Sequence, residues 1–264
     1  MKKFMFAATV AAAMAGFAVE SQIVGYTTVA YGSQFKLNGN MFVNVGDNTK
    51  YNLYDFKIVG GDPERDYIQF LETTKLHFDD NKKFYYYEDE DAPEDNGWYY
   101  KAGPLIDEKV EFEDAWIPAN VAALCEFRSS SDIQLQYAGQ VKLATDGVVT
   151  LERPQQLNLY CNPLPRTVDL TEVKMTDFDP ERDYIQFLET SKLHFDDNKK
   201  FYYYEDEDAP EDNGWYFKAG PKIDEPVEVG DCVIGIGEGF LGEFRSSVDT
   251  TLVFPDPLTA PKAE

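Results

Sequence analysis

The sequence predicts an all-β protein made of two tandem antiparallel modules, each a β-sandwich or a small barrel. Three observations carry this prediction. A 43-residue passage from Asp62 to Pro104 recurs from Asp179 to Pro221 with only two substitutions. Short runs rich in Val, Ile, Thr, Tyr and Phe are bounded by Gly, Pro, Asn and Asp, which is typical of strands and turns. No stretch keeps helical spacing over three turns.

The repeat extends beyond this passage on both sides. Upstream, Gly25 to Phe42 aligns with Gly147 to Leu164, and downstream, Glu126 to Tyr137 aligns with Glu243 to Phe254. An internal duplication is therefore expected, with module 1 at residues 23–141, module 2 at 145–258 and a polar tail at 259–264. Either recent recombination or a shared task would explain why the centre is so similar.

The first residues read as a processing signal. Lys2 and Lys3 precede an alanine-rich apolar stretch and then small residues, which is the pattern of a secretory signal peptide over residues 1–20 with cleavage near Ala15 or Ala18. A secreted, periplasmic or cell-surface protein is expected. Cleavage after Ala15 or Ala18 removes Lys2 and Lys3 but no acidic residue, so it makes the net charge of −24 two units more negative. Such a charge argues against nucleic acid and anionic lipid as partners, and no later segment is apolar for long enough to insert into a membrane.

In module 1 the expected strands follow one another between turn residues. Asp79 to Lys83 is expected to be a turn, and the loop Asp89 to Asn96 is expected to close the next hairpin on Gly97. The result is a three-stranded meander, which needs a second layer to bury its apolar face. The expected strands include Gly25–Val29, Phe35–Phe42, Asp66–Leu71, Leu76–Phe78, Phe84–Tyr87, Trp98–Lys101, Lys109–Phe112 and Ile133–Tyr137.

One of the two substitutions in the repeat predicts which face of a strand is core. In an extended Trp98 to Lys101, Trp98 and Tyr100 share one face, and Tyr99 lies on the other. Module 2 has Phe217 in place of Tyr100, so that hydroxyl is dispensable. The Trp98 face is therefore expected to be core and the Tyr99 face solvent.

At this point the frame GYTTV…F.LNGNMF…IQFL…FYYYE…GWYYKAG…LQYAGQV resembles a loose family of secreted bacterial β-repeat proteins. The resemblance covers nearly the whole mature chain and implies a β fold and export. That family has no established activity, so no catalytic residue is carried over. Module 2 departs at its end, where Pro255-Asp256-Pro257 stands in place of Ala138-Gly139-Gln140.

An acidic loop occurs once in each module, between Glu88 and Gly97 and between Glu205 and Gly214. Clustered carboxylates suit weak calcium binding, since calcium takes six to eight oxygen ligands in a flexible cage. The D-x-D-x-D-G spacing of a helical calcium loop is absent, and a solvated hairpin tip is the competing interpretation. The candidate ligands are Asp89, Asp91, Glu94 and Asp95, with Asp206, Asp208, Glu211 and Asp212 in module 2.

Aromatic strands offer a second kind of site. Their rings lie on both faces of the expected sheet, so one set could stack against sugar rings while the other packs in the core. Ordinary cross-strand aromatic pairing is the alternative. The candidate ligand-binding residues are Tyr86, Tyr99, Tyr203 and Tyr216.

The remaining chemistry-bearing residues favour no enzyme class. The three cysteines, Cys125, Cys161 and Cys232, have no counterparts in the other module, so a disulfide repeated in each module is excluded, while one bridge plus a free thiol stays open. His77 and His194 have no marked nucleophile partner. We therefore expect a non-catalytic structural or adhesive protein of the cell surface or matrix, able to bind a glycan, a surface protein or itself. A carbohydrate-binding protein and a secreted polysaccharide or peptide hydrolase are the alternatives.

Overall fold

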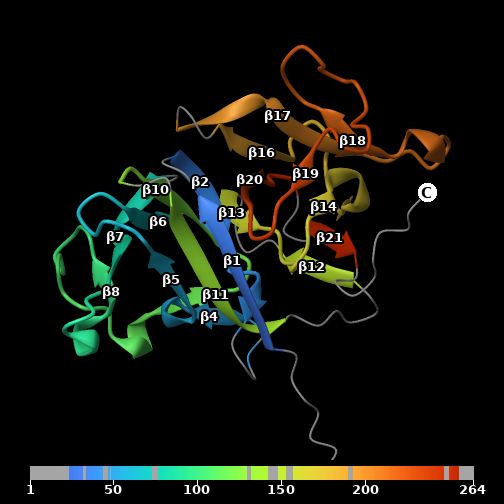
Figure 1. Cartoon of the computed structure of the whole chain (residues 1–264). Coiled ribbons are helices and arrows are strands. Elements are labelled where there is room, and N and C mark those ends of the chain that lie inside the picture. Colours follow the sequence, from blue (N-terminus) through green and yellow to red (C-terminus); the bar gives the residue numbers. More distant parts are fainter. Residues whose placement is uncertain are drawn as a thin grey trace, which may run out of the picture.

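The protein is all-β, as predicted, and its two halves share one strand plan, except that one strand of the first half has no counterpart in the second (Figure 1). The computed structural model describes residues 24–31, 34–43, 47, 49–72, 77–129, 132–141, 148–152, 157–189, 193–246 and 250–255. The expected leader, the module junction and the polar tail lie outside these residues. Within the described ranges the helical segments are five three-residue 3₁₀ turns, and no helix is long and apolar enough to span a membrane.

Module 1 is a sandwich of two open antiparallel sheets. Strand β11 is the middle strand of the first sheet, with β1 on one side and β3 and β5 on the other, whereas the second sheet has the order β2-β10-β6-β7-β8, and β4 pairs with β9. Their bounds are β1 Val24–Tyr31, β2 Gln34–Gly39, β3 Phe42–Val43, β4 Lys50–Asn52, β5 Phe56–Val59, β6 Tyr67–Glu72, β7 His77–Tyr87, β8 Gly97–Tyr100, β9 Trp116–Pro118, β10 Ala122–Phe127 and β11 Ile133–Val141, with 3₁₀ turns η1 Leu53–Asp55, η2 Pro93–Asp95 and η3 Phe112–Asp114.

Module 2 repeats this plan with one strand fewer. The order β13-β20-β16-β17-β18 matches the five-stranded sheet of module 1, β12-β21-β15 matches β1-β11-β5, and β14 pairs with β19 as β4 pairs with β9. The bounds are β12 Val148–Glu152, β13 Leu157–Cys161, β14 Val168–Asp169, β15 Lys174–Thr176, β16 Tyr184–Glu189, β17 His194–Tyr204, β18 Gly214–Phe217, β19 Val233–Ile234, β20 Gly239–Glu243 and β21 Thr251–Pro255, with η4 Leu170–Glu172 and η5 Pro210–Asp212.

Each sandwich has its own core around a buried tryptophan. Trp98 is completely buried, and its indole nitrogen donates a hydrogen bond to the Phe56 carbonyl oxygen at 3.0 Å. Phe56 and Tyr137 stack beside it, with ring centroids 5.4 Å apart. Trp215 repeats the arrangement in module 2 by donating to the Val173 carbonyl oxygen at 2.7 Å. The Trp98 face is therefore core, in agreement with the sequence expectation.

Two expected elements of module 1 differ from the structure. Asp79 to Lys83 is not a turn, because β7 runs unbroken through it and pairs with β6 on both sides of an irregularity between Gln69 and Leu71. The extra residues form a bulge, in which Asp79 accepts a hydrogen bond from the Asn81 backbone nitrogen and Gln69 donates to Asp80. The expected strand Lys109–Phe112 is reduced to a single bridge between Lys109 and Tyr99, followed by η3.

The two sandwiches pack against each other through approximate two-fold symmetry. The backbone nitrogen of Gly39 donates to the Gly237 carbonyl oxygen at 3.0 Å, and the nitrogen of Cys161, which aligns with Gly39, donates at 3.0 Å to Asn120, which aligns with Gly237. A small apolar interface cluster is shared between them. It consists of Leu37, Ala122 and Leu124 from module 1 and Leu159, Cys161 and Leu241 from module 2.

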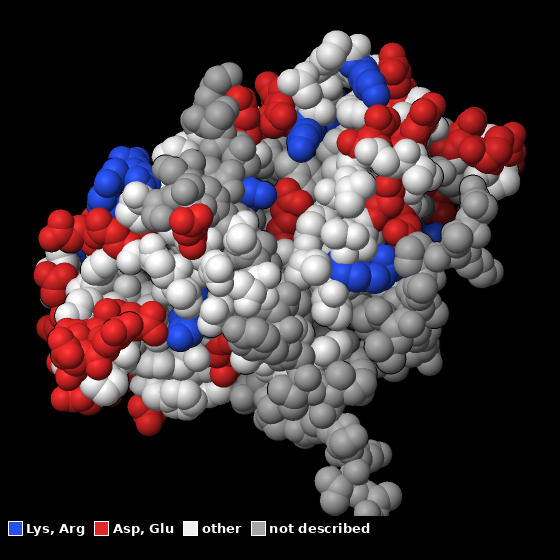
Figure 2. Space-filling view, viewed as in Figure 1, with Lys and Arg blue, Asp and Glu red and all other residues white. Residues whose placement is uncertain are grey.

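This symmetry places the two acidic hairpin loops at opposite ends of the molecule. Figure 1 shows the β7–β8 hairpin at one end and the β17–β18 hairpin at the other, and Figure 2 shows acidic side chains gathered at both ends. Corresponding surfaces of the two modules therefore face solvent at opposite ends of the molecule.

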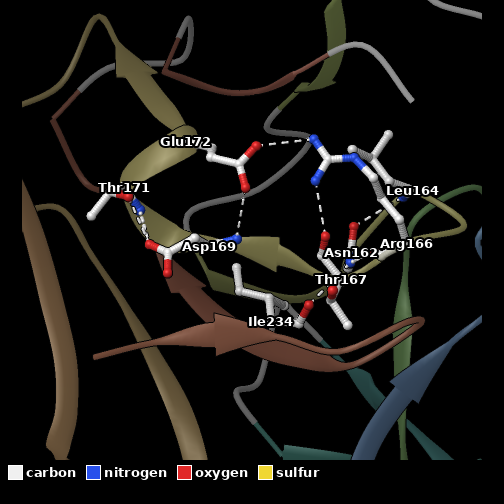
Figure 3. Close-up of polar contacts among 8 residues, drawn as sticks. All are labelled: Asn162, Leu164, Arg166, Thr167, Asp169, Thr171, Glu172 and Ile234. Atoms are coloured by element: carbon white, nitrogen blue, oxygen red, sulfur yellow. Dashed lines mark hydrogen bonds and ion pairs between the residues drawn. The ribbon is translucent and has the colours of Figure 1, made fainter. Parts of the chain in front are cut away.

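Module 2 lacks a counterpart of β3 because its chain is five residues shorter here and contains two prolines, which cannot donate to a strand ladder. Polar side chains hold the shortened connection instead (Figure 3). The buried side chain of Asn162 donates to the carbonyl oxygens of Arg166 and Gly235, and Arg166 forms a 3.0 Å ion pair with Glu172. Glu172 also accepts a hydrogen bond from the Asp169 backbone nitrogen and so caps η4.

Candidate functional site

Three tyrosines of module 1 share the solvent-side face of the β7–β8 hairpin. Tyr85 pairs directly with Tyr99, and Tyr87 follows two residues along β7 on the same face. The Tyr85 and Tyr99 rings stack with centroids 5.5 Å apart, and Tyr87 meets Tyr99 edge-on at 6.1 Å. We call these residues tyrosine surface 1.

Module 2 reproduces this array as tyrosine surface 2, formed by Tyr202, Tyr204 and Tyr216. The stacked pair Tyr202–Tyr216 has its centroids 5.6 Å apart, and the edge-on pair Tyr204–Tyr216 has them 5.9 Å apart. All six rings are partly exposed. The molecule therefore presents the same aromatic array twice.

A hydrogen bond from each hydroxyl fixes the rings of surface 1. Tyr85 donates to Asp107 at 3.2 Å, Tyr87 to Asp89 at 3.1 Å, and Tyr99 to the Asp95 carbonyl oxygen at 2.7 Å. The partners in surface 2 are the equivalent Asp224, Asp206 and Asp212. The arrays are thus ordered before any ligand arrives, which lowers the entropy cost of binding.

Lysine side chains flank the tyrosines. Lys101 donates to the carbonyl oxygens of Pro63 and Glu64 at 2.8 and 3.0 Å, and its nitrogen lies 5.2 Å from the Tyr85 ring centroid. Lys109 donates to the Glu94 carbonyl oxygen, beside Tyr99. These cations lie next to the array in an otherwise acidic chain.

The candidate residues Tyr86 and Tyr99 do not share a surface, because their side chains lie on opposite faces of the hairpin. Tyr86 pairs with Trp98 and packs against the core, and the equivalent Tyr203 is only 6% exposed. Tyr99 and Tyr216 are on the solvent side, as expected. Their partners in the array are Tyr85 and Tyr87 in module 1 and the equivalent tyrosines in module 2. The sequence did not indicate these partners, because a run of three tyrosines does not reveal which of them faces Tyr99 across the hairpin.

A buried carboxylate lies on the same sheet face, beyond β7. Glu126 accepts a hydrogen bond from the Tyr67 hydroxyl and forms an ion pair with Arg128, while the Lys83 nitrogen lies 3.8 Å from the Tyr67 ring centroid. Module 2 repeats the cluster with Glu243, Tyr184, Arg245 and Lys200. The only sequence signal for it is its identity in both modules.

Asp66 joins two loops beside this cluster. Its carboxylate, 2% exposed, accepts hydrogen bonds from the backbone nitrogens of Asp62, Arg128 and Ser129 and from the Ser129 hydroxyl. Every near acceptor site is occupied by the chain's own donors. Asp66 and its equivalent Asp183 therefore have a structural role.

The acidic loops are folded around their own backbone. Asp89 accepts from the backbone nitrogen of Asp91, and its own nitrogen donates to Asn96 at 2.6 Å. Asp206 in module 2 forms the same two hydrogen bonds as Asp89. The remaining candidate ligands are exposed in both modules, namely Asp91, Glu94 and Asp95 and their equivalents Asp208, Glu211 and Asp212. Across the part of the chain that the structure describes, no three metal-ligating side chains converge. Calcium binding by these loops stays a prediction from sequence.

We expect calcium to leave the melting temperature unchanged. Three of the four candidate carboxylates in each loop are exposed to solvent and do not converge, and the fourth already accepts hydrogen bonds from the protein itself. The measurement is calorimetric melting in calcium and in chelator. A bound ion would raise stability by RT ln(1 + [L]/Kd), so a rise that grows with calcium concentration would overturn the solvated-tip interpretation.

None of the three cysteines forms a disulfide, and all three are buried. Burial raises the pKa of the Cys125 and Cys232 thiols to about 12, which keeps them protonated and poorly nucleophilic. The disulfide left open by the sequence is therefore not formed in this structure.

Burial, followed by the neighbouring aspartates, also raises the pKa of Tyr85 and Tyr202 to about 12 from the usual 10.0. The protonated phenol is thus favoured in the folded state, so its contribution to stability is complete below pH 10 and is lost as pH rises toward 12. We expect the free energy of unfolding to fall over this window. Denaturant titrations with tyrosinate absorbance measure it. In the double variant Tyr85→Phe/Tyr202→Phe, the free energy of unfolding should fall less steeply with pH. If both tyrosines ionise in the folded protein without a loss of stability, the raised pKa values of these two phenols are contradicted.

A scan against protein-family models finds no match, and searches of curated proteins and of solved structures find none either.

Proposed function

We propose that this chain is an exported, non-catalytic adhesive protein that binds carbohydrate polymers through tyrosine surfaces 1 and 2. The observation that carries the proposal is the repetition of one fixed three-tyrosine array at two ends of the molecule. Export rests on the sequence pattern of residues 1–20.

The chemistry of the arrays suits sugar rings. A tyrosine face packs against the apolar C–H surface of a pyranose, and the hydroxyl supplies a polar contact at the ring edge. Asp107 and Asp89 lie at the array's edge with acceptor oxygens that could also bind sugar hydroxyls. A charge of −24 disfavours polyanions, and the neutral C–H faces that suit the tyrosine rings make neutral polymers the ligand class that we propose.

Two weak arrays on one molecule would bind a polymer by avidity. Linking two sites turns the second binding event into an intramolecular one, and this raises the overall affinity without a new contact. A polymer long enough to reach both ends, or two neighbouring polymers, would satisfy this geometry.

A glycan array tests the proposal. Wild-type protein is expected to bind one class of neutral glycan, and the double variant Tyr99→Ala/Tyr216→Ala should lose it, since each array would keep no stacked pair. The matched control is Tyr100→Phe, which copies Phe217 on the opposite face of the same strand and should bind like wild type. Unchanged binding by a folded double variant, or no glycan bound by wild type, would refute the proposal.

A further inference from the structure

A cavity of similar size lies in each module, on the side of β8 or β18 away from the tyrosine surfaces. It measures about 350 Å³ in module 1 and 330 Å³ in module 2. Five aligned positions line both cavities. They are Asn81, Lys82, Phe84, Tyr100 and Asp114 in module 1 and Asn198, Lys199, Phe201, Phe217 and Asp231 in module 2.

In module 2 the chain places its own ammonium group at this cavity. The Lys222 nitrogen lies 3.1 Å from an Asp231 carboxylate oxygen and 4.9 Å from the Phe217 ring centroid. A carboxylate and an aromatic face together make a favourable environment for a cation.

Module 1 has an aromatic ring and a carboxylate at the same two positions, but no ammonium among the described residues is paired with that carboxylate. Leu105 occupies the position of Lys222, and Tyr100 that of Phe217. Within the described chain, the Asp114 carboxylate accepts no hydrogen bond and forms no ion pair. Its charge reaches Tyr100, since Asp114 contributes to the raised pKa of that phenol after burial.

The walls of the module 1 cavity are more aromatic than those of the module 2 cavity. Trp116 lines it where module 2 has Val233, and the four aromatic residues of the lining are Phe70, Phe84, Tyr100 and Trp116. The Lys50 nitrogen already lies 4.5 Å from the Trp116 ring centroid, so the lining ring next to Asp114 that carries no ammonium in the described ranges is that of Tyr100. Asn158 closes one side from module 2. It is 5% exposed, and its side-chain nitrogen donates to no residue that the structure describes.

We propose that the module 1 cavity binds a primary alkylammonium group, with Asp114 as the counter-ion and the ring of Tyr100, which corresponds to Phe217, as the aromatic wall. Lys222 in module 2 is the internal counterpart of this ligand. Lys82 at the cavity is no obstacle, because the equivalent Lys199 lines the module 2 cavity beside Lys222. The acidic chain raises the local concentration of cations and so favours the encounter.

The test uses n-butylammonium as the probe and n-butanol as its neutral isostere, followed by two-dimensional NMR of the full chain. The ammonium is expected to shift the signals of Trp116, Asp114 and Tyr100 saturably, and the alcohol is not. Asp114→Asn should weaken binding by about tenfold or more, since it removes the charge of an exposed side chain and leaves its shape.

A reciprocal pair of variants distinguishes this site from non-specific attraction to an acidic protein. Leu105→Lys supplies the missing internal ammonium and should abolish binding in module 1. Lys222→Leu removes the internal ammonium from module 2 and should create a second saturable site there. Binding that is unaffected by Leu105→Lys, or equal binding of n-butanol, would overturn the proposal.

A short peptide with one lysine distinguishes the two sources of this group. Competition between the peptide and n-butylammonium would mean that lysine side chains of a partner protein reach the cavity, and a peptide that fails to compete would restrict it to free amines. Both results support ammonium recognition. Acetate, which could bind to Lys82 at the cavity, is the opposite probe. If acetate shifts the same NMR signals and n-butylammonium does not, the proposal of ammonium recognition is contradicted.

Discussion

Replacing Trp98 with alanine is expected to lower the free energy of unfolding by about 3–5 kcal/mol, the usual cost of removing a large aromatic side chain from a core. The ring is completely buried, contacts Phe56 and Tyr86 at centroid distances of 4.8 and 5.3 Å, and satisfies the Phe56 carbonyl oxygen. Trp215→Ala should cost a similar amount, since Tyr203 and Val173 form the equivalent contacts.

Urea denaturation measures this effect, with Tyr99→Phe as the control. Tyr99 lies on the same strand but on the solvent side, so losing its hydroxyl should cost no more than about 1 kcal/mol. A loss for Trp98→Ala as small as that of the control would mean that Trp98 does not hold the sandwich together.

Replacing Leu241 with aspartate is expected to uncouple the two sandwiches. The side chain lies in the interface cluster with Leu37, Leu124 and Leu159, where a carboxylate would find no partner, at a cost of several kcal/mol. Close approach here already needs glycine, since a Cβ on Gly239 would lie 2.7 Å from side-chain carbons of Leu37 and Ala122. Each module keeps its own core, so both should remain folded while they separate.

Calorimetry and small-angle scattering check this expectation. A single wild-type transition should split into two, and the radius of gyration should rise. The control Ile223→Asp places the same charge at an exposed position of module 2 and should change neither quantity. A Leu241→Asp protein that melts and scatters like wild type would show that the interface cluster does not join the modules.

Composition and repeat pattern were sufficient to predict the all-β class, the β7–β8 hairpin and the buried Trp98 face. The bulge in β7 was not predictable, because its Asp, Asn and Lys residues have turn composition, and only pairing with β6 on both sides makes them part of a strand. Strand β10 was missed since all six of its residues are buried, so the apolar–polar alternation that marks a half-exposed strand is absent.

The candidate site was predictable only in part. Tyr99 was placed on the solvent side by one substitution in the repeat, but the register that brings Tyr85 beside it depends on the backbone of the hairpin. Nothing in the sequence marks Asp114 or Lys222 as part of a site. Their proposed role is seen only when the cavities of the two folded modules are compared.

The central claim is that two equivalent tyrosine arrays act together. The most direct test is to measure how fast the protein dissociates from an immobilised polysaccharide that the wild type binds. Tyr99→Ala and Tyr216→Ala are each expected to shorten the residence time by about a hundredfold through lost avidity, while each still binds a short oligosaccharide at its remaining array. The double variant should bind neither. Single variants that leave the polymer as slowly as wild type, or a double variant that still binds the oligosaccharide, would contradict the account.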